Sequence, residues 1–182
     1  MTESEDRFLK AWISWLRTLP ADAELLGRAL RDVELREETR RPLAAALNYL
    51  FKSLDLIDDG IEGLGFLDDA FVLRVAVEQA GAAVPAGAAV PDYLAPLLAD
   101  AELVHEFLGP DLSSRMGKYV FGLGTSMVRG RSVEEISSNP EVRDALLGDL
   151  AGWGSRYEKP NFAADSKNLI KMRSFLAAKL PA

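Results

Sequence analysis

Apolar residues recur every three or four positions along most of this chain, the spacing that places them on one face of an α-helix. The first such segment carries a face of large apolar side chains: Phe8, Trp12, Trp15, Leu16 and Leu19. Pro20 is expected to end this helix, because proline has no backbone N–H to donate, and Asp22 is expected to cap a second helix.

Further helices are predicted wherever a capping residue or a first-turn proline precedes an apolar-periodic segment. These starting points are Pro42, Asp68 or Asp69, Asp92 or Pro96, Ser132, Asn139–Pro140 and Asp165. No segment alternates polar and apolar residues in the manner of a half-buried strand. The pattern therefore predicts an all-α fold, a helical bundle of about seven or eight helices.

Residues 81–91 interrupt the helical pattern with small residues, two prolines and no charge. We expect a connector here, between an N-terminal helical half (1–80) and a C-terminal helical half (92–182). Both halves are expected to form one all-α domain over residues 1–182. A chain of 182 residues buries enough surface to fold without disulfides, and this chain has no cysteine.

Composition excludes several classes of function. A net charge of −7 argues against a general nucleic-acid-binding protein, which would present a basic surface. The acidic start and the lack of a run of 18 apolar residues predict a cytoplasmic protein with neither signal peptide nor transmembrane span. His105 is the single histidine, and no phosphate-binding loop or Gly-x-Ser-x-Gly motif is present. The sequence therefore favours a protein that is not an enzyme.

The excess negative charge is concentrated between Asp55 and Asp69. This segment holds six acids and no base: Asp55, Asp58, Asp59, Glu62, Asp68 and Asp69. Without them, the remaining 22 of the 28 acids nearly match the 21 Lys and Arg residues. Apolar residues such as Ile57 and Leu64 are interleaved with the acids, and their burial would draw the carboxylates toward one another.

The same segment resembles the YkvA-like family, the bacterial domain of unknown function 1232. Eight residues stand where that family's pattern has them: Asp55, Leu56, Ile57, Asp59, Gly65, Leu67, Asp68 and Asp69. Leu54, Asp58 and Glu62 occupy positions at which the family usually has proline, so the chain resembles a divergent member. The resemblance covers residues 42–80 and implies a helical hairpin. It implies no established activity, and some members of the family carry membrane spans.

Two interpretations of the acidic segment are open, in addition to contact with a basic partner. In the first, the acids form caps and turns, with Asp68 and Asp69 accepting hydrogen bonds at a helix start. In the second, Asp55 and Asp59 meet Asp68 or Asp69 around a divalent cation, with Asp58 and Glu62 as additional acids. Oxygen ligands alone favour Mg²⁺ or Ca²⁺. The segment is not an EF-hand, because Phe66 stands where that loop requires a bidentate acid.

Three functions are compatible with these observations. The leading expectation is a non-enzymatic interaction or scaffold module that binds an unknown protein partner or forms a homo-oligomer. The second is a divalent-metal-binding protein or metal-dependent hydrolase that uses the acidic segment. The third is a peripheral membrane adaptor, with Phe8, Trp12 and Trp15 as its membrane or partner face. The basic C-terminal helix, which includes Lys179, offers charge complementary to the acidic segment.

Overall fold

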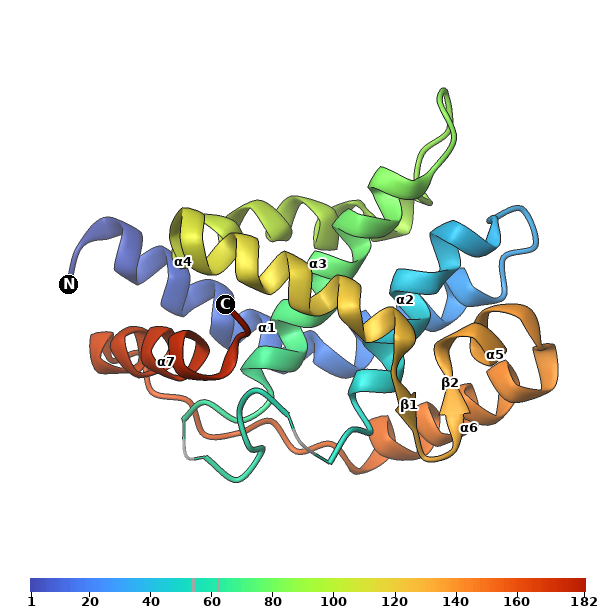
Figure 1. Cartoon of the computed structure of the whole chain (residues 1–182). Helices are drawn as coiled ribbons and strands as arrows, with labels where there is room; N and C mark the ends of the chain where they lie inside the picture. The colour runs from blue at the N-terminus through green and yellow to red at the C-terminus, as the bar shows by residue number, and fades with distance from the viewer. Residues whose placement is uncertain (54, 62) are drawn as a thin grey trace.

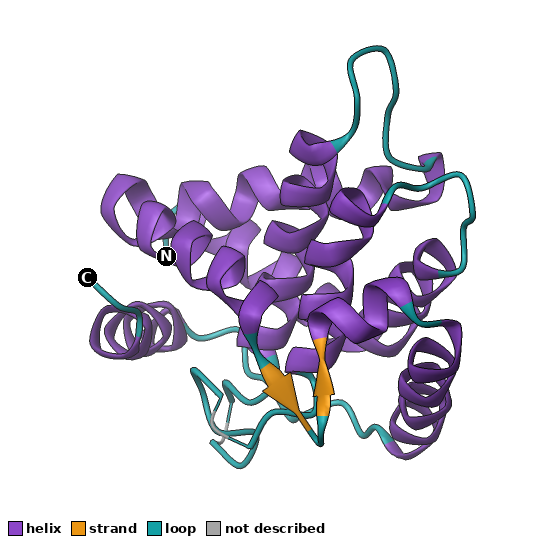
Figure 2. Ribbon diagram, turned by 45° about the vertical axis from the view of Figure 1, so that its right-hand side comes forward, coloured by secondary structure: helices purple, strands orange, loops and turns teal. Residues whose placement is uncertain are grey.

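The computed structural model describes residues 1–53, 55–61 and 63–182 and confirms the all-α prediction. Within this part of the chain the helices are α1 (Glu3–Leu30), α2 (Glu37–Tyr49), α3 (Leu67–Ala83), α4 (Ala95–Gly122), α5 (Val133–Ser138), α6 (Pro140–Arg156) and α7 (Ser166–Lys179) (Figure 1). Two 3₁₀ turns, Asp92–Leu94 and Leu123–Thr125, flank α4. An antiparallel pair of two-residue strands, β1 (Met127–Val128) and β2 (Arg131–Ser132), precedes α5 (Figure 2).

The core is built around α3, which packs against α1, α2 and α4. Every residue of α3 from Leu67 to Val77 is buried, so this helix has no solvent-exposed face over three turns. Trp12 of α1 is fully buried and packs edge-on against Phe71 and Phe107, with ring centroids 5.7 and 4.8 Å away. Burial of such large aromatic surfaces is the main source of stability in a bundle of this size.

The expectation that Phe8, Trp12 and Trp15 form a membrane or partner face is wrong. All three side chains are buried, with exposed fractions of 9%, 0% and 3%. Their helical spacing places them on the face of α1 that packs into the core, so they are not available to a lipid surface. No helix in the described residues is long and apolar enough to cross a membrane.

The expected connector is shorter than predicted, because α3 continues to Ala83. Residues 84–91 then form a loop that projects from the body of the molecule (Figures 1 and 2). The helix starts at Ser132, Asn139 and Asp165 are confirmed, and each of these side chains accepts a hydrogen bond from the first turn that follows it. α1 contacts helices before and after the loop, including α2, α3, α6 and α7.

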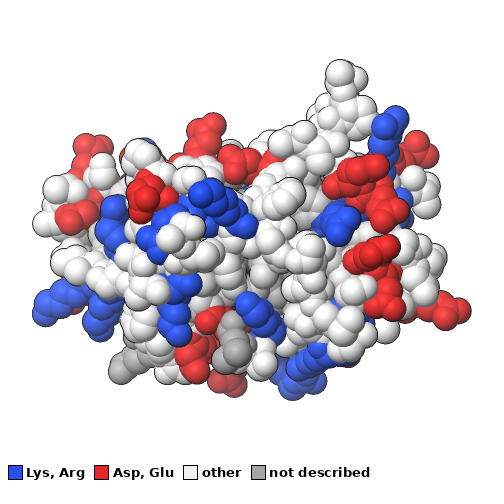
Figure 3. All heavy atoms as spheres, in the orientation of Figure 1, with Lys and Arg blue, Asp and Glu red and all other residues white. Residues whose placement is uncertain are grey.

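Residues 50–53, 55–61 and 63–66, between α2 and α3, lie at the lower edge of the molecule between α7 and α6 (Figure 1). Acidic side chains gather on the surface there, and basic side chains flank them on both sides (Figure 3). The acidic segment and part of the basic C-terminal helix therefore share one region of the surface.

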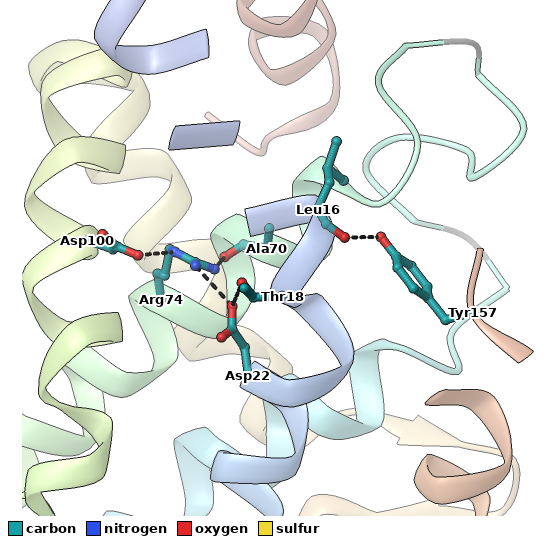
Figure 4. Close-up of polar contacts among 7 residues, drawn as sticks. All are labelled: Leu16, Thr18, Asp22, Ala70, Arg74, Asp100 and Tyr157. Atoms are coloured by element: carbon teal, nitrogen blue, oxygen red, sulfur yellow. Dashed lines mark hydrogen bonds and ion pairs between the residues drawn. The ribbon is translucent and has the colours of Figure 1, made fainter. Parts of the chain in front are cut away.

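α1 does not end at Pro20, contrary to the prediction, and runs on to Leu30. Pro20 cannot donate the helical hydrogen bond to the Leu16 carbonyl. That carbonyl instead accepts a hydrogen bond from the hydroxyl of Tyr157, 2.6 Å away (Figure 4). A residue distant in the sequence thus satisfies the group that Pro20 leaves free. Asp22 consequently lies inside α1 rather than at its start.

A buried arginine joins three helices around this point of α1. Arg74 of α3 is 1% exposed, and its guanidinium donates to Asp22 of α1 (3.0 Å) and Asp100 of α4 (3.1 Å) (Figure 4). It also donates to the Ala70 carbonyl and lies 4.2 Å from the ring centroid of Trp15. Burial raises the pKa of Asp22, although the charge of Arg74 opposes that shift. A buried ion pair is tolerated only when hydrogen bonds satisfy its charged groups, and the contacts of Arg74 do this for the Asp22–Arg74 pair.

α4 is sharply bent at Gly109, whose φ of 71° lies in the left-handed region, and Pro110 restarts the helix. The bend brings His105 close to Ser113, with 2.6 Å between Nδ1 and Oγ. On its other side His105 Nε2 lies 2.7 Å from a carboxylate oxygen of Glu78 in α3. The single histidine therefore holds the two halves of α4 together and against α3.

Candidate functional site

Two side chains, Tyr49 and Asp68, fix the path of the loop that joins α2 to α3, which we call the acidic loop. The hydroxyl of Tyr49, at the end of α2, donates to Asp68 Oδ2 in the first turn of α3, 2.6 Å away. The same hydroxyl accepts the backbone N–H of Leu56 (2.8 Å), and Asp68 Oδ2 also accepts the N–H of Ile57 (3.1 Å). These four buried groups tie the loop to both helices, and the sequence did not predict this arrangement.

The end of the loop contains a very close approach of two backbone segments. A Cβ added at Gly65 would lie 2.1 Å from the backbone oxygen of Asp59, so no residue with a side chain fits there without movement. Phe66 follows with a φ of 65° and is the N-cap of α3, which has no side-chain cap. The prediction that Asp68 or Asp69 caps this helix is therefore wrong. Both lie within its first turn.

The four predicted ligands differ in how deeply they are buried. Asp68 and Asp69 are buried beneath the loop, with exposed fractions of 0% and 3%. Asp55 is half-buried, and Asp59 is exposed. Asp58, expected as an additional acid, accepts the N–H of Gly60 in a local turn (2.8 Å). Glu62, the other additional acid, lies outside the described residues.

Burial and mutual repulsion raise the pKa values of these carboxyl groups above the usual value for Asp. Desolvation raises the pKa of Asp55 to about 7, and the charges of Asp68 and Asp59 add to this shift, while Lys52 opposes it. Burial also raises the pKa of Asp68 to about 6, against the effect of its hydrogen bonds from Tyr49 and Ile57. The pKa of Asp69 is raised well above its usual value by burial and by the other three carboxylates. The four groups therefore act as one electrostatic unit, which we call the acidic cluster (Asp55, Asp59, Asp68 and Asp69).

The acidic cluster lacks the partners that buried carboxylates normally have. Asp55 Oδ1 and Asp68 Oδ1 are buried without a hydrogen-bond partner among the described residues. No Lys or Arg in that part of the chain forms an ion pair with any member of the cluster. Unpartnered buried oxygens cost free energy unless a proton or a cation satisfies them. Within the described residues, however, no three acidic or histidine side chains are already arranged to hold a metal ion.

Two hollows open beside the cluster and share Lys52, Ser53 and Asp59 in their walls. The smaller, of about 410 Å³, is lined by Asp55 and Asp59 and by Lys179 of α7. The larger, of about 710 Å³, lies between the loop, the β1–β2 turn and α6, and we call it the α6 cleft. Nothing in the sequence pattern predicted the α6 cleft, because its walls come from segments about 100 residues apart (residues 50–53, 59 and 66 on one side, 129 and 148–158 on the other).

The fold and this site define an all-α protein with a tightly anchored acidic hairpin. Residues 42–74 match the family described as a protein of unknown function (DUF1232), consistent with a divergent member. The matched segment runs from α2 through the acidic loop into α3. No curated protein and no solved structure matches the chain. Within the matched segment, the contacts among Tyr49, Leu56, Ile57 and Asp68 fix the loop between the two helices.

Proposed function

We propose that the protein is a helical binding module whose acidic cluster takes up a hard divalent cation, Mg²⁺ or Ca²⁺. The observation that supports this proposal is the pair of buried, unpartnered oxygens, Asp55 Oδ1 and Asp68 Oδ1, in a cluster without a basic partner in the described residues. Asp68 is fully buried, so water does not compensate its charge. A divalent cation would satisfy the free oxygen of Asp55 and offset the repulsion among the four carboxylates.

The different burial of the four carboxylates suggests different roles for them. Asp55 and Asp59 line the smaller hollow and are the candidates for direct ligands. Asp68 and Asp69 are buried and supply negative charge that attracts the cation. Mg²⁺ commonly takes only one or two carboxylates and keeps several water molecules. This mode of binding does not need a preformed set of three protein ligands.

Thermal unfolding in EDTA, compared with unfolding in millimolar Mg²⁺ or Ca²⁺, tests the proposal. An ion at about 100 times its dissociation constant stabilises the folded state by about 2.7 kcal/mol. For a chain of this length, that corresponds to a rise in Tm of roughly 5–10 °C. Asp55→Asn should abolish the rise. Asp111→Asn, at an exposed position of α4 far from the cluster in sequence, should retain it.

The proposal is wrong if neither ion raises the Tm of the wild-type protein, or if Asp55→Asn responds as the wild type does. Binding of a protein partner, the leading expectation from the sequence, stays a prediction. A cation-binding module is compatible with it, because neutralising the acidic cluster would change the charge that this surface presents to a partner.

A further inference from the structure

The α6 cleft has a wall of aromatic side chains held in fixed positions. Tyr157 packs edge-on against Phe66 from the acidic loop, with ring centroids 5.2 Å apart, and its ring is tilted against that of Trp153 of α6, 5.3 Å away. All three are partly buried and contact the core. The hydroxyl of Tyr157 is anchored on the Leu16 carbonyl (Figure 4). A wall of this kind presents flat apolar surface at little cost in side-chain entropy.

A strained turn holds an arginine side chain in the wall of the cleft. Arg129 and Gly130 form the two-residue turn between β1 and β2, with φ values of 51° and 74°. Two left-handed residues are the signature of a type I′ hairpin turn, which strongly prefers Asn or Gly. Arginine at such a position costs about 1 kcal/mol. The turn places the Arg129 guanidinium 4.8 Å from the ring centroid of Phe51, another residue of the cleft wall.

Arg129 shares its nearest acid, Asp149, with Arg131. Asp149 of α6 accepts a hydrogen bond from Arg131 at 2.8 Å, whereas its contact with Arg129 is 3.8 Å long. Asp149 therefore pairs more closely with Arg131 than with Arg129, whose side chain stays 59% exposed. A strained backbone and an incompletely paired charge at the same residue are a combination typical of binding sites.

Two more basic side chains line the cleft without an ion-pair partner in the described part of the chain. Lys52 donates to the hydroxyl of Tyr119, 3.0 Å away, and Arg156 is exposed at the end of α6. Asp59 of the acidic cluster lines the same cleft, and it does not pair with either of them. Three basic side chains, the carboxylates of Asp59, Asp149 and Glu158, and aromatic rings thus line one open cleft of about 710 Å³, a volume within the range of small-molecule sites.

We propose that the α6 cleft binds a nucleotide. The base stacks against Trp153 and Tyr157, and the phosphate is held by Arg129, Arg156 and Lys52. The phosphate oxygens face Asp59 and complete the ligand shell of the divalent cation, so this part of the inference rests on the proposed function above. Mg²⁺ is commonly bound in this way, by one or two carboxylates together with phosphate oxygens. Arginine guanidinium groups suit phosphate oxygens because they donate two parallel hydrogen bonds.

Isothermal titration of the full-length protein with AMP, ATP, adenosine and inorganic phosphate tests the inference, each with Mg²⁺ and with EDTA. We expect AMP or ATP to bind at least tenfold more tightly than adenosine or phosphate alone. Trp153→Leu and Arg156→Ser should each weaken nucleotide binding about tenfold or more. Arg17→Ser, at an exposed position on α1, is the matched control and should bind as the wild type does. Circular dichroism establishes that each variant is folded.

The outcomes separate this inference from the cation proposal. Nucleotide binding that persists in EDTA and weakens in Arg156→Ser supports the cleft, even if ions alone do not change the Tm. Failure of AMP and ATP to bind at millimolar concentration, with or without Mg²⁺, overturns the inference even if the ions do raise the Tm. Phosphate that binds as tightly as AMP overturns the role of the aromatic wall. Equal loss of affinity in Arg17→Ser and Arg156→Ser overturns the assignment of the phosphate to this cleft.

Discussion

Gly65 occupies a position at which only a hydrogen atom fits. A Cβ there would lie 2.1 Å from the backbone oxygen of Asp59 and 2.8 Å from its carbonyl carbon. Gly65→Ala must therefore push the two backbone segments apart, and we expect a loss of about 2–3 kcal/mol in the free energy of unfolding. Urea unfolding monitored by circular dichroism measures this change.

Gly117 of α4 is the matched control, because a Cβ added there meets nothing within 4 Å. Gly117→Ala should leave the stability of the protein unchanged or increase it by up to about 1 kcal/mol, because alanine has the higher helix propensity. Similar unfolding midpoints for the two variants would contradict the close approach at Gly65. Because Asp59 belongs to the acidic cluster, Gly65→Ala should also weaken any response of the Tm to Mg²⁺.

At the level of the helix, α1 stays continuous through Pro20 because Tyr157 replaces the missing hydrogen bond (Figure 4). Tyr157→Phe leaves the Leu16 carbonyl without that donor and should cost about 1–2 kcal/mol. In a Pro20→Ala background, the alanine supplies a backbone N–H to the same carbonyl. We therefore expect the Tyr157→Phe change to cost measurably less in that background. A double-mutant cycle by urea unfolding measures the difference, and an unchanged cost would show that the two groups do not share the carbonyl.

The elements that the sequence predicted correctly are those whose signals are local. Ser132 and Asn139 cap helices through residues two or three positions away, so the pattern contains all the relevant information. The continuation of α1 past Pro20 depends on Tyr157, which lies 141 positions after Leu16. No local pattern contains this information. The apolar residues between Asp55 and Asp68 require burial, and the approach of these two carboxylates could be predicted from that requirement. The Tyr49–Asp68 contact and the α6 cleft could not, because they depend on how distant segments pack.

For the whole molecule, the acidic cluster predicts an unusual dependence of stability on pH in the metal-free protein. The pKa of Asp55 is raised to about 7 and that of Asp68 to about 6, whereas in the unfolded chain an Asp titrates near pH 4. Between pH 4 and 7 the folded protein therefore holds protons that the unfolded chain has released. The free energy of unfolding must fall as pH rises through this window. Its maximum therefore lies toward the acidic side of the pH range in which proteins are usually most stable.

Urea unfolding in EDTA at pH 4.5, 6.0 and 7.5 checks this prediction. We expect a loss of about 2 kcal/mol across the series, after allowance for solvent screening of the half-buried Asp55. Asp55→Asn removes one of the groups responsible, so its stability should fall less and should exceed that of the wild type at pH 7.5. Saturating Mg²⁺ should flatten the wild-type profile, because a bound cation stabilises the ionised carboxylates and lowers their pKa values. Stability that rises from pH 4.5 to 7.5 in EDTA would show that the cluster is compensated within the protein and has no need of a cation.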